Sequence, residues 1–112
     1  MQIYKIFRRG EWEELDTAGQ TAGAPVDLAD GFIHFSTAEQ VRETALRHFS
    51  GEDDLVIAAV DAASLGSDLK WEASRGGALF PHLFRTLQRS DVTWHAPLPL
   101  DGQRHRFPEV VA

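Results

Sequence analysis

The chain has 112 residues, no cysteine, and 17 acidic against 11 basic residues, which gives a formal net charge of −6. This length predicts a single domain over residues 1–112, and the absence of cysteine excludes disulfides, thiolate nucleophiles and cysteine zinc sites. The acidic balance argues against nucleic-acid binding, which depends on neutralising many phosphates. No segment approaches the roughly 20 apolar residues of a membrane span, and residues 1–9 lack a signal-peptide pattern. We therefore expect a cytoplasmic protein with no membrane partner.

The first quarter of the chain predicts one strand followed by irregular structure. Residues 3–7 are rich in β-forming side chains and predict a short first strand. Residues 11–15 fit either a helical turn or a loop. Residues 17–25 are rich in Gly, Ala, Thr and Pro, which predicts an exposed connection.

A second strand and a capped helix are predicted next. Residues 31–35 read as the strand, and Ser36 with Glu39 three positions later forms a capping box. The helix then covers about residues 37–49 and ends at Ser50-Gly51. Its apolar residues recur at intervals of three and four, which gives one face for the core: Ala38, Val41, Ala45 and Phe49.

The second half of the chain predicts further strands. Residues 55–60 form a continuous apolar run, which is typical of a central strand. Residues 61–67 turn the chain, residues 69–73 predict another strand, and residues 92–95 predict a late strand that ends before Pro97. Several short strands with one main helix, residues 37–49, predict an α+β domain.

The most informative polar residues are His34 and Ser36. In an extended strand they share one face, while Ile33 and Phe35 share the other. Imidazole and hydroxyl groups can hold a sugar or a phosphate, and the N-terminus of the following helix would favour a phosphate or dinucleotide ligand. The alternative is that Ser36 only caps the helix and His34 only satisfies a backbone carbonyl.

Three further residues could carry chemistry. Glu72, next to Trp71, could act as a general base or stabilise positive charge, or could simply face solvent from its strand. His82 is either held in place for function or buried and hydrogen-bonded. Tyr4 either packs in the core or stacks on a base or nicotinamide. No Gly-x-Ser-x-Gly motif surrounds Ser36 and no metal-ligand spacing is present, so we expect neither a serine triad nor a metal.

Several motifs, in order along almost the whole chain, resemble one known family. The similarity lies in Gly31–Thr37 with Gln40, in Trp71-Glu72, in Phe80–Leu83, and in Asp101-Gly102 with Phe107-Pro108. These residues resemble the hallmark of the small bacterial proteins grouped as domain-of-unknown-function family 952. The chain departs from that pattern at Arg85–Arg89.

This family looks like a remote, compact relative of the ADP-ribosylation superfamily, which includes mono-ADP-ribosyltransferases and RNA 2′-phosphotransferases. The resemblance implies a split β-sandwich of short, mostly antiparallel strands, with NAD as cofactor in the cleft between two small sheets. It implies that Tyr4, His34, Phe35 and Ser36 hold the dinucleotide, and we add His82 to these cofactor-binding candidates. By the same resemblance Glu72 is the candidate for the catalytic glutamate of the superfamily, and His34 is the second catalytic candidate.

Three functions follow as alternatives. The first is an enzyme that performs NAD-dependent ADP-ribosyl transfer or NAD glycohydrolysis. In it Glu72 stabilises a ribosyl oxocarbenium ion, and His34 forms hydrogen bonds with the hydroxyls of the sugar. The second is a non-catalytic module that binds a nucleotide or phosphorylated small molecule. The third is a structural or protein-interaction domain, in which the strand of His34 and Ser36 is only well packed.

Overall fold

The structure, a computed structural model, describes residues 1–111, without the side chain of Arg75. Its longest strands form an antiparallel sheet in the order β1 (Gln2–Arg8), β4 (Leu55–Asp61) and β8 (Val92–Leu98). The prediction of a central strand over residues 55–60 is confirmed, because these residues are buried on both faces of the sheet. β8 continues through Pro97, contrary to expectation, since it is an edge strand and proline is tolerated there.

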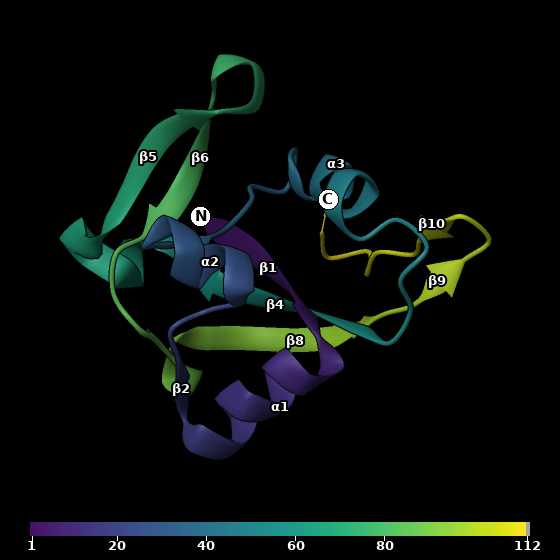
Figure 1. Ribbon diagram of the computed structural model, residues 1–112, viewed down its shortest axis with the longest axis horizontal. Coiled ribbons are helices and arrows are strands. Elements are labelled where there is room, and N and C mark those ends of the chain that lie inside the picture. The colour runs from purple at the N-terminus through teal and green to yellow at the C-terminus, as the bar shows by residue number, and fades with distance from the viewer. Residues whose placement is uncertain (112) are drawn as a thin grey trace.

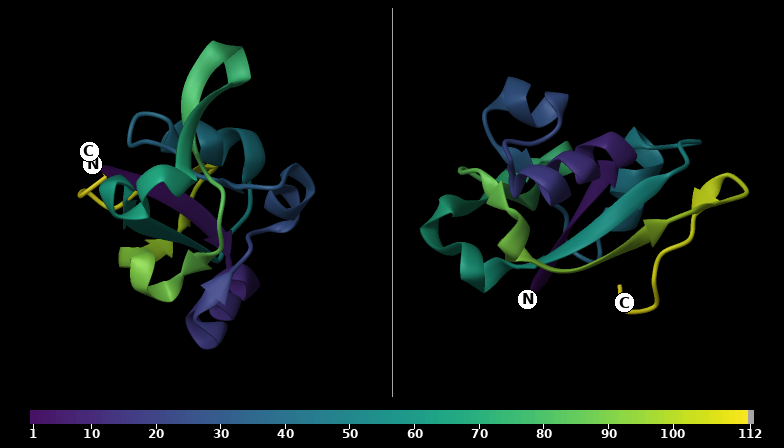
Figure 2. Two further views of the ribbon diagram at one scale, coloured as in Figure 1. Left: turned by 90° about the vertical axis from the view of Figure 1, so that its left-hand side faces the viewer. Right: turned by 90° about the horizontal axis from the view of Figure 1, so that it is seen from below.

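A second, smaller sheet has the order β3 (Ile33–His34), β6 (Ala78–Leu83) and β5 (Leu69–Ser74). β5 and β6 form a hairpin that projects away from the large sheet (Figures 1 and 2). β3 is shorter than the predicted strand over residues 31–35, because Gly31 ends the preceding helix with a φ of 85°. In the register between β3 and β6, His34 lies opposite His82.

The structure has three α-helices within residues 1–111. A helix does lie within the predicted range of residues 37–49, but the expectation that it is the one main helix is wrong. The three helices are α1 (Arg9–Ala18), α2 (Pro25–Asp30) and α3 (Val41–His48). α3 begins later than predicted because Ser36 does not cap it: the Ser36 hydroxyl lies 2.8 Å from that of Thr44. Instead, the Gln40 side chain accepts a hydrogen bond from the Thr37 backbone N–H at 3.0 Å.

Short elements connect these units. β2 (Gln20–Thr21) pairs with β7 (Leu87–Gln88), and β9 (Leu100–Asp101) pairs with β10 (Arg104–His105). The 3₁₀ turns are η1 (Ala62–Asp68), η2 (Arg75–Gly77) and η3 (Arg89–Asp91). The expected exposed connection over residues 17–25 is therefore partly wrong. It contains β2 and the start of α2, and Thr21 and Ala24 are buried.

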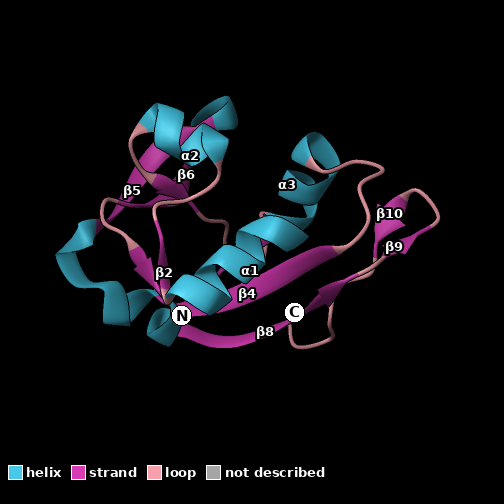
Figure 3. Cartoon of the chain, turned by 60° about the horizontal axis from the view of Figure 1, so that its bottom comes forward, coloured by secondary structure: helices cyan, strands magenta, loops and turns pink. Residues whose placement is uncertain are grey.

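The core has two parts, one on each side of the large sheet. Ile3 and Phe7 of β1 pack on one side with α1, whereas Tyr4 and Ile6 pack on the other with α3. Figures 1 and 3 show α1 and α3 on opposite sides of this sheet. The predicted apolar face of α3 is confirmed, since Val41 and Ala45 are buried in the second part of the core. No helix within residues 1–111 has the length and apolar character needed to cross a membrane.

Candidate functional site

A pocket of about 540 Å³ is lined by elements from both three-stranded sheets. β1 of the large sheet forms one wall, β3 and β6 of the small sheet form another, and α2 and α3 complete it. The polar side chains at its surface include Lys5, Asp30, His34, Ser36 and His82. The two sheets therefore create a pocket whose walls carry both apolar and ionisable groups.

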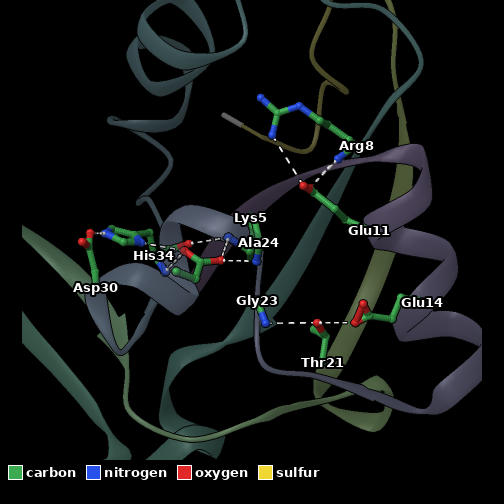
Figure 4. A network of polar contacts seen from close by, with 10 residues as sticks. Lys5, Arg8, Glu11, Glu14, Thr21, Gly23, Ala24, Asp30 and His34 are labelled. Atoms are coloured by element: carbon green, nitrogen blue, oxygen red, sulfur yellow. Dashed lines mark hydrogen bonds and ion pairs between the residues drawn. The ribbon is translucent and has the colours of Figure 1, made fainter.

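The carboxylate of Asp27 is the centre of a buried polar network beside this pocket. Its side chain is fully buried, and Oδ2 accepts hydrogen bonds from Lys5 Nζ at 2.9 Å and from the Ala24 backbone N–H at 2.8 Å. Oδ1 accepts from the His34 backbone N–H at 3.1 Å and lies 2.6 Å from His34 Nδ1. Figure 4 shows Lys5, Ala24 and His34 converging here. One carboxylate thus joins α2 to β1 and β3.

Asp27 is ionised at neutral pH despite its burial. Burial by itself raises the pKa of this carboxyl, but the hydrogen bond with His34, the positive charge and hydrogen bond of Lys5 and the Ala24 N–H together lower the pKa to about 2. A buried charge is costly unless it is paired and hydrogen-bonded. Lys5 is itself almost fully buried and provides the opposite charge.

The loop before α2 is shaped so that Asp27 can approach. Gly23 has a φ of 112°, and a Cβ atom built on it would lie 2.5 Å from the Asp27 Cβ. Only glycine fits such a backbone conformation and such a close contact. The Gly23 N–H donates to Thr21 Oγ1 at 3.0 Å, and the Thr21 hydroxyl donates to Glu14 of α1 at 3.3 Å (Figure 4).

The His34 ring lies between two carboxylates. Nδ1 faces Asp27, and Nε2 lies 3.0 Å from Asp30 Oδ2. The His34 side chain is 34% exposed and that of Asp30 47%, whereas Asp27 is inaccessible. A neutral imidazole has one N–H and can donate to only one of these carboxylates; donation to both requires the imidazolium form.

His82 lies beside His34 and also contacts a carboxylate. Its Nδ1 is 2.8 Å from Glu72 Oε1, and its ring stacks on Phe32 with 4.2 Å between the ring centroids. The centroids of the two histidine rings are 5.3 Å apart, in an edge-on arrangement. The pocket wall therefore carries two adjacent imidazoles, each with a carboxylate at Nδ1, a setting suited to hydrogen bonding and proton exchange.

The structure brings most of the predicted site residues together. All five cofactor-binding candidates line the pocket: Tyr4, His34, Phe35, Ser36 and His82. Tyr4 and Ser36 also form a backbone bridge, with N–H to carbonyl distances of 2.8 and 2.9 Å, and burial raises the pKa of the Tyr4 phenol. Glu72 is not among the lining residues and reaches the site only through His82.

Sequence reasoning missed Lys5, Asp27 and Asp30. Lys5 could have been found because it shares a strand face with Ile3 and Phe7, which are core residues. A lysine on such a face is buried, and a buried cation requires a carboxylate partner. Asp27 lies three residues after Ala24 at the start of a helix, a position from which a carboxylate can cap the helix. Within residues 1–111, no group of three or more His, Cys, Asp or Glu side chains is arranged to hold a metal ion.

The fold and the site define a small α+β domain with a polar pocket between two antiparallel sheets. The chain belongs to the family described as "Protein of unknown function (DUF952)", whose model matches residues 6–95. A search among curated proteins found no match.

Solved structures with the same fold come from Caulobacter crescentus. The chain is 51% identical in sequence to protein CC0527. Its fold matches the crystal structure of that protein with a TM-score of 0.94, over 99% of this chain and 98% of the other. A crystal structure of a double mutant of CC0527 gives 49% identity and a TM-score of 0.94, with the same coverage. The solution NMR structure of CC0527 gives 55% identity and a TM-score of 0.83, over 93% of this chain and 90% of the other.

Proposed function

We propose that the pocket binds a dinucleotide of the NAD type and supports cleavage of its nicotinamide–ribose bond. The observation that carries this proposal is the convergence of Tyr4, His34, Phe35, Ser36 and His82 on one pocket from three different strands and the segment after β3. Its volume of about 540 Å³ falls within the range of small-molecule sites, roughly 300–1,000 Å³. The arrangement of two small sheets around a pocket also agrees with an ADP-ribosylation-like fold.

In the proposed reaction the bond between ribose C1′ and the nicotinamide nitrogen breaks. Nicotinamide leaves with the bonding electron pair as a neutral base, and the ribose becomes an oxocarbenium ion. Water, or the nucleophile of an acceptor, then forms a new bond to C1′ and releases one proton. His34, which is partly exposed in the pocket, accepts a hydrogen bond from a ribose hydroxyl, and nearby carboxylates stabilise the positive charge.

Glu72 contributes indirectly in this scheme. Its carboxylate contacts His82 Nδ1 and not the pocket surface, so we assign it a positioning role. Asp30 is the carboxylate that lines the pocket and remains accessible. The site can therefore supply negative charge near a bound sugar without using the fully buried Asp27.

The proposal is tested by measuring nicotinamide release from NAD by chromatography. We expect slow release by the wild type and loss of both binding and turnover in His34→Ala, because the ribose loses its hydrogen-bond partner. Glu72→Gln should lower turnover by about 10–100-fold, as loss of an orienting partner does at other sites, while NAD binding persists. Trp12→Phe, in the core on the side of α1, serves as the matched control. Equal release by His34→Ala and the wild type would contradict the proposal.

The position of Glu72 outside the pocket favours a second candidate, a binding module that does not consume its ligand. In that case NAD or another phosphorylated metabolite binds the same pocket, His34→Ala weakens binding, and no nicotinamide is released. Binding measured by calorimetry together with the release assay separates the two functions.

A further inference from the structure

We infer that Asp27 is a positioning residue that fixes the orientation and the tautomer of His34. A single oxygen, Oδ1, contacts both the backbone N–H of His34 at 3.1 Å and the ring Nδ1 at 2.6 Å. The backbone and the ring of one residue are thereby held by the same atom, which leaves the ring little freedom to rotate.

Asp27 can fulfil this role because its own position is fixed. Its second oxygen accepts from Lys5 Nζ and from the Ala24 N–H, and its side chain has no exposed surface. Lys5 Nζ also donates to the His34 carbonyl at 3.2 Å, so the cation holds both the carboxylate and the strand that carries the histidine. Such outer partners orient the residues that contact a ligand.

The tautomer follows from this geometry. Both carboxylates only accept hydrogen bonds, but Asp27 is fully buried and has no access to water, whereas Asp30 is 47% exposed, so the single proton of the neutral ring is held on Nδ1. When the ring is neutral, Nε2 is therefore the unprotonated nitrogen, and it is the one that contacts Asp30, which also lines the pocket. Asp30 lies at the end of α2 and its side chain is about half exposed, so a ligand hydroxyl can replace it as the partner of Nε2. This last step rests on the proposed function, whereas the tautomer does not.

The test is NMR of the two ring nitrogens of His34 in the ¹⁵N-histidine-labelled protein, at a pH where histidine is neutral. We expect a protonated Nδ1 and an unprotonated Nε2 in the wild type, and the same pattern in Asp30→Asn. A wild-type His34 with its proton on Nε2 would overturn the inference, and this result does not require any variant to fold.

Asp27→Asn provides the second comparison. The asparagine oxygen is needed by Lys5 and the Ala24 N–H, so the NH₂ group takes the place of Oδ1. There it gives up the hydrogen bond from the His34 backbone N–H and faces Nδ1, and we expect the ring proton to move to Nε2. An analogous exchange in a catalytic triad yields the wrong tautomer and a rate loss of about 10⁴-fold. Here we expect NAD affinity to fall by about 10–100-fold. The ring signals of His82, which contacts Glu72 instead, should keep their pattern in this variant.

The outcomes separate the inference from the proposed function. A protonated Nδ1 in a protein that neither binds nor cleaves NAD supports the positioning role of Asp27 and contradicts the function. NAD cleavage by a protein in which neutral His34 carries its proton on Nε2 contradicts the positioning role of Asp27 and supports the function. An unchanged tautomer in folded Asp27→Asn would also overturn the inference.

Discussion

Asp27→Ala is expected to lower the free energy of unfolding by about 3–5 kcal/mol, the usual effect of breaking a buried ion pair by removing one partner. The substitution leaves the Lys5 ammonium buried without its counter-charge. It also removes the acceptor for the backbone N–H groups of Ala24 and His34. Urea unfolding followed by tryptophan fluorescence measures the change as a lower midpoint at a similar slope.

Asp30→Ala is the matched control for this prediction. It removes a carboxylate from the same helix and the same histidine, but from a half-exposed position. Exposed ion pairs are worth only about 0–1 kcal/mol, so we expect a loss within that range. The double variant Lys5→Met/Asp27→Leu should recover much of the stability, because apolar pairs often replace buried ion pairs without a net loss. A loss below about 1 kcal/mol in Asp27→Ala would contradict the role of Asp27 in joining α2 to the sheets.

Acidification is expected to remove the contribution of Asp27 to stability below pH 4. The pKa of this carboxyl is about 2 in the folded protein, against an ordinary value of 3.8. The unfolded state therefore takes up the proton first as the pH falls. The contribution, about 2 kcal/mol, is fully present above pH 4 and is lost as the pH falls through about 2.

The direct measurement is a ¹³C titration of the side-chain carboxyl of Asp27 by NMR, combined with urea unfolding at several pH values. We expect the Asp27 midpoint near pH 2. An Asp27 midpoint near 4, with unfolding that has the same pH dependence in the wild type and in Asp27→Asn, would show that the network does not stabilise the ionised form.

The longer strands could be predicted from the sequence because runs of apolar and β-forming residues mark them locally. The continuous apolar run at residues 55–60 identified the central strand, and the β-forming side chains of residues 3–7 identified the first strand. The helices were harder to predict. α1 buries only Trp12 and Leu15 among its ten residues, which is too weak a pattern to separate a helix from a loop.

The start of α3 was mispredicted for a different reason. A serine followed three residues later by a glutamate has the form of a capping box, but a tertiary contact competes for the hydroxyl. Ser36 Oγ contacts Thr44 Oγ1 within the pocket wall. Local motifs identify groups that can cap a helix, and the folded environment decides whether they do so.

The candidate site was predicted only as far as single strands reveal it. His34 and Ser36 stood out because they share a strand face, and His82 was a candidate as a histidine held in place or buried. The network of Lys5, Asp27 and Asp30 depends on the packing of α2 against β1 and β3. No local sequence pattern reports such a contact, because its partners come from separate elements that meet only in the folded protein.

The proposed nucleotide pocket is tested most directly by NMR titration of the ¹⁵N-labelled protein with NAD up to millimolar concentration. We predict amide shift changes confined to the pocket, centred on Tyr4, His34, Ser36 and His82, with no change at Leu15 of α1. The same titration of His34→Ala should give much weaker changes. An absence of shifts at the pocket, or changes centred on α1, would contradict nucleotide binding at this site.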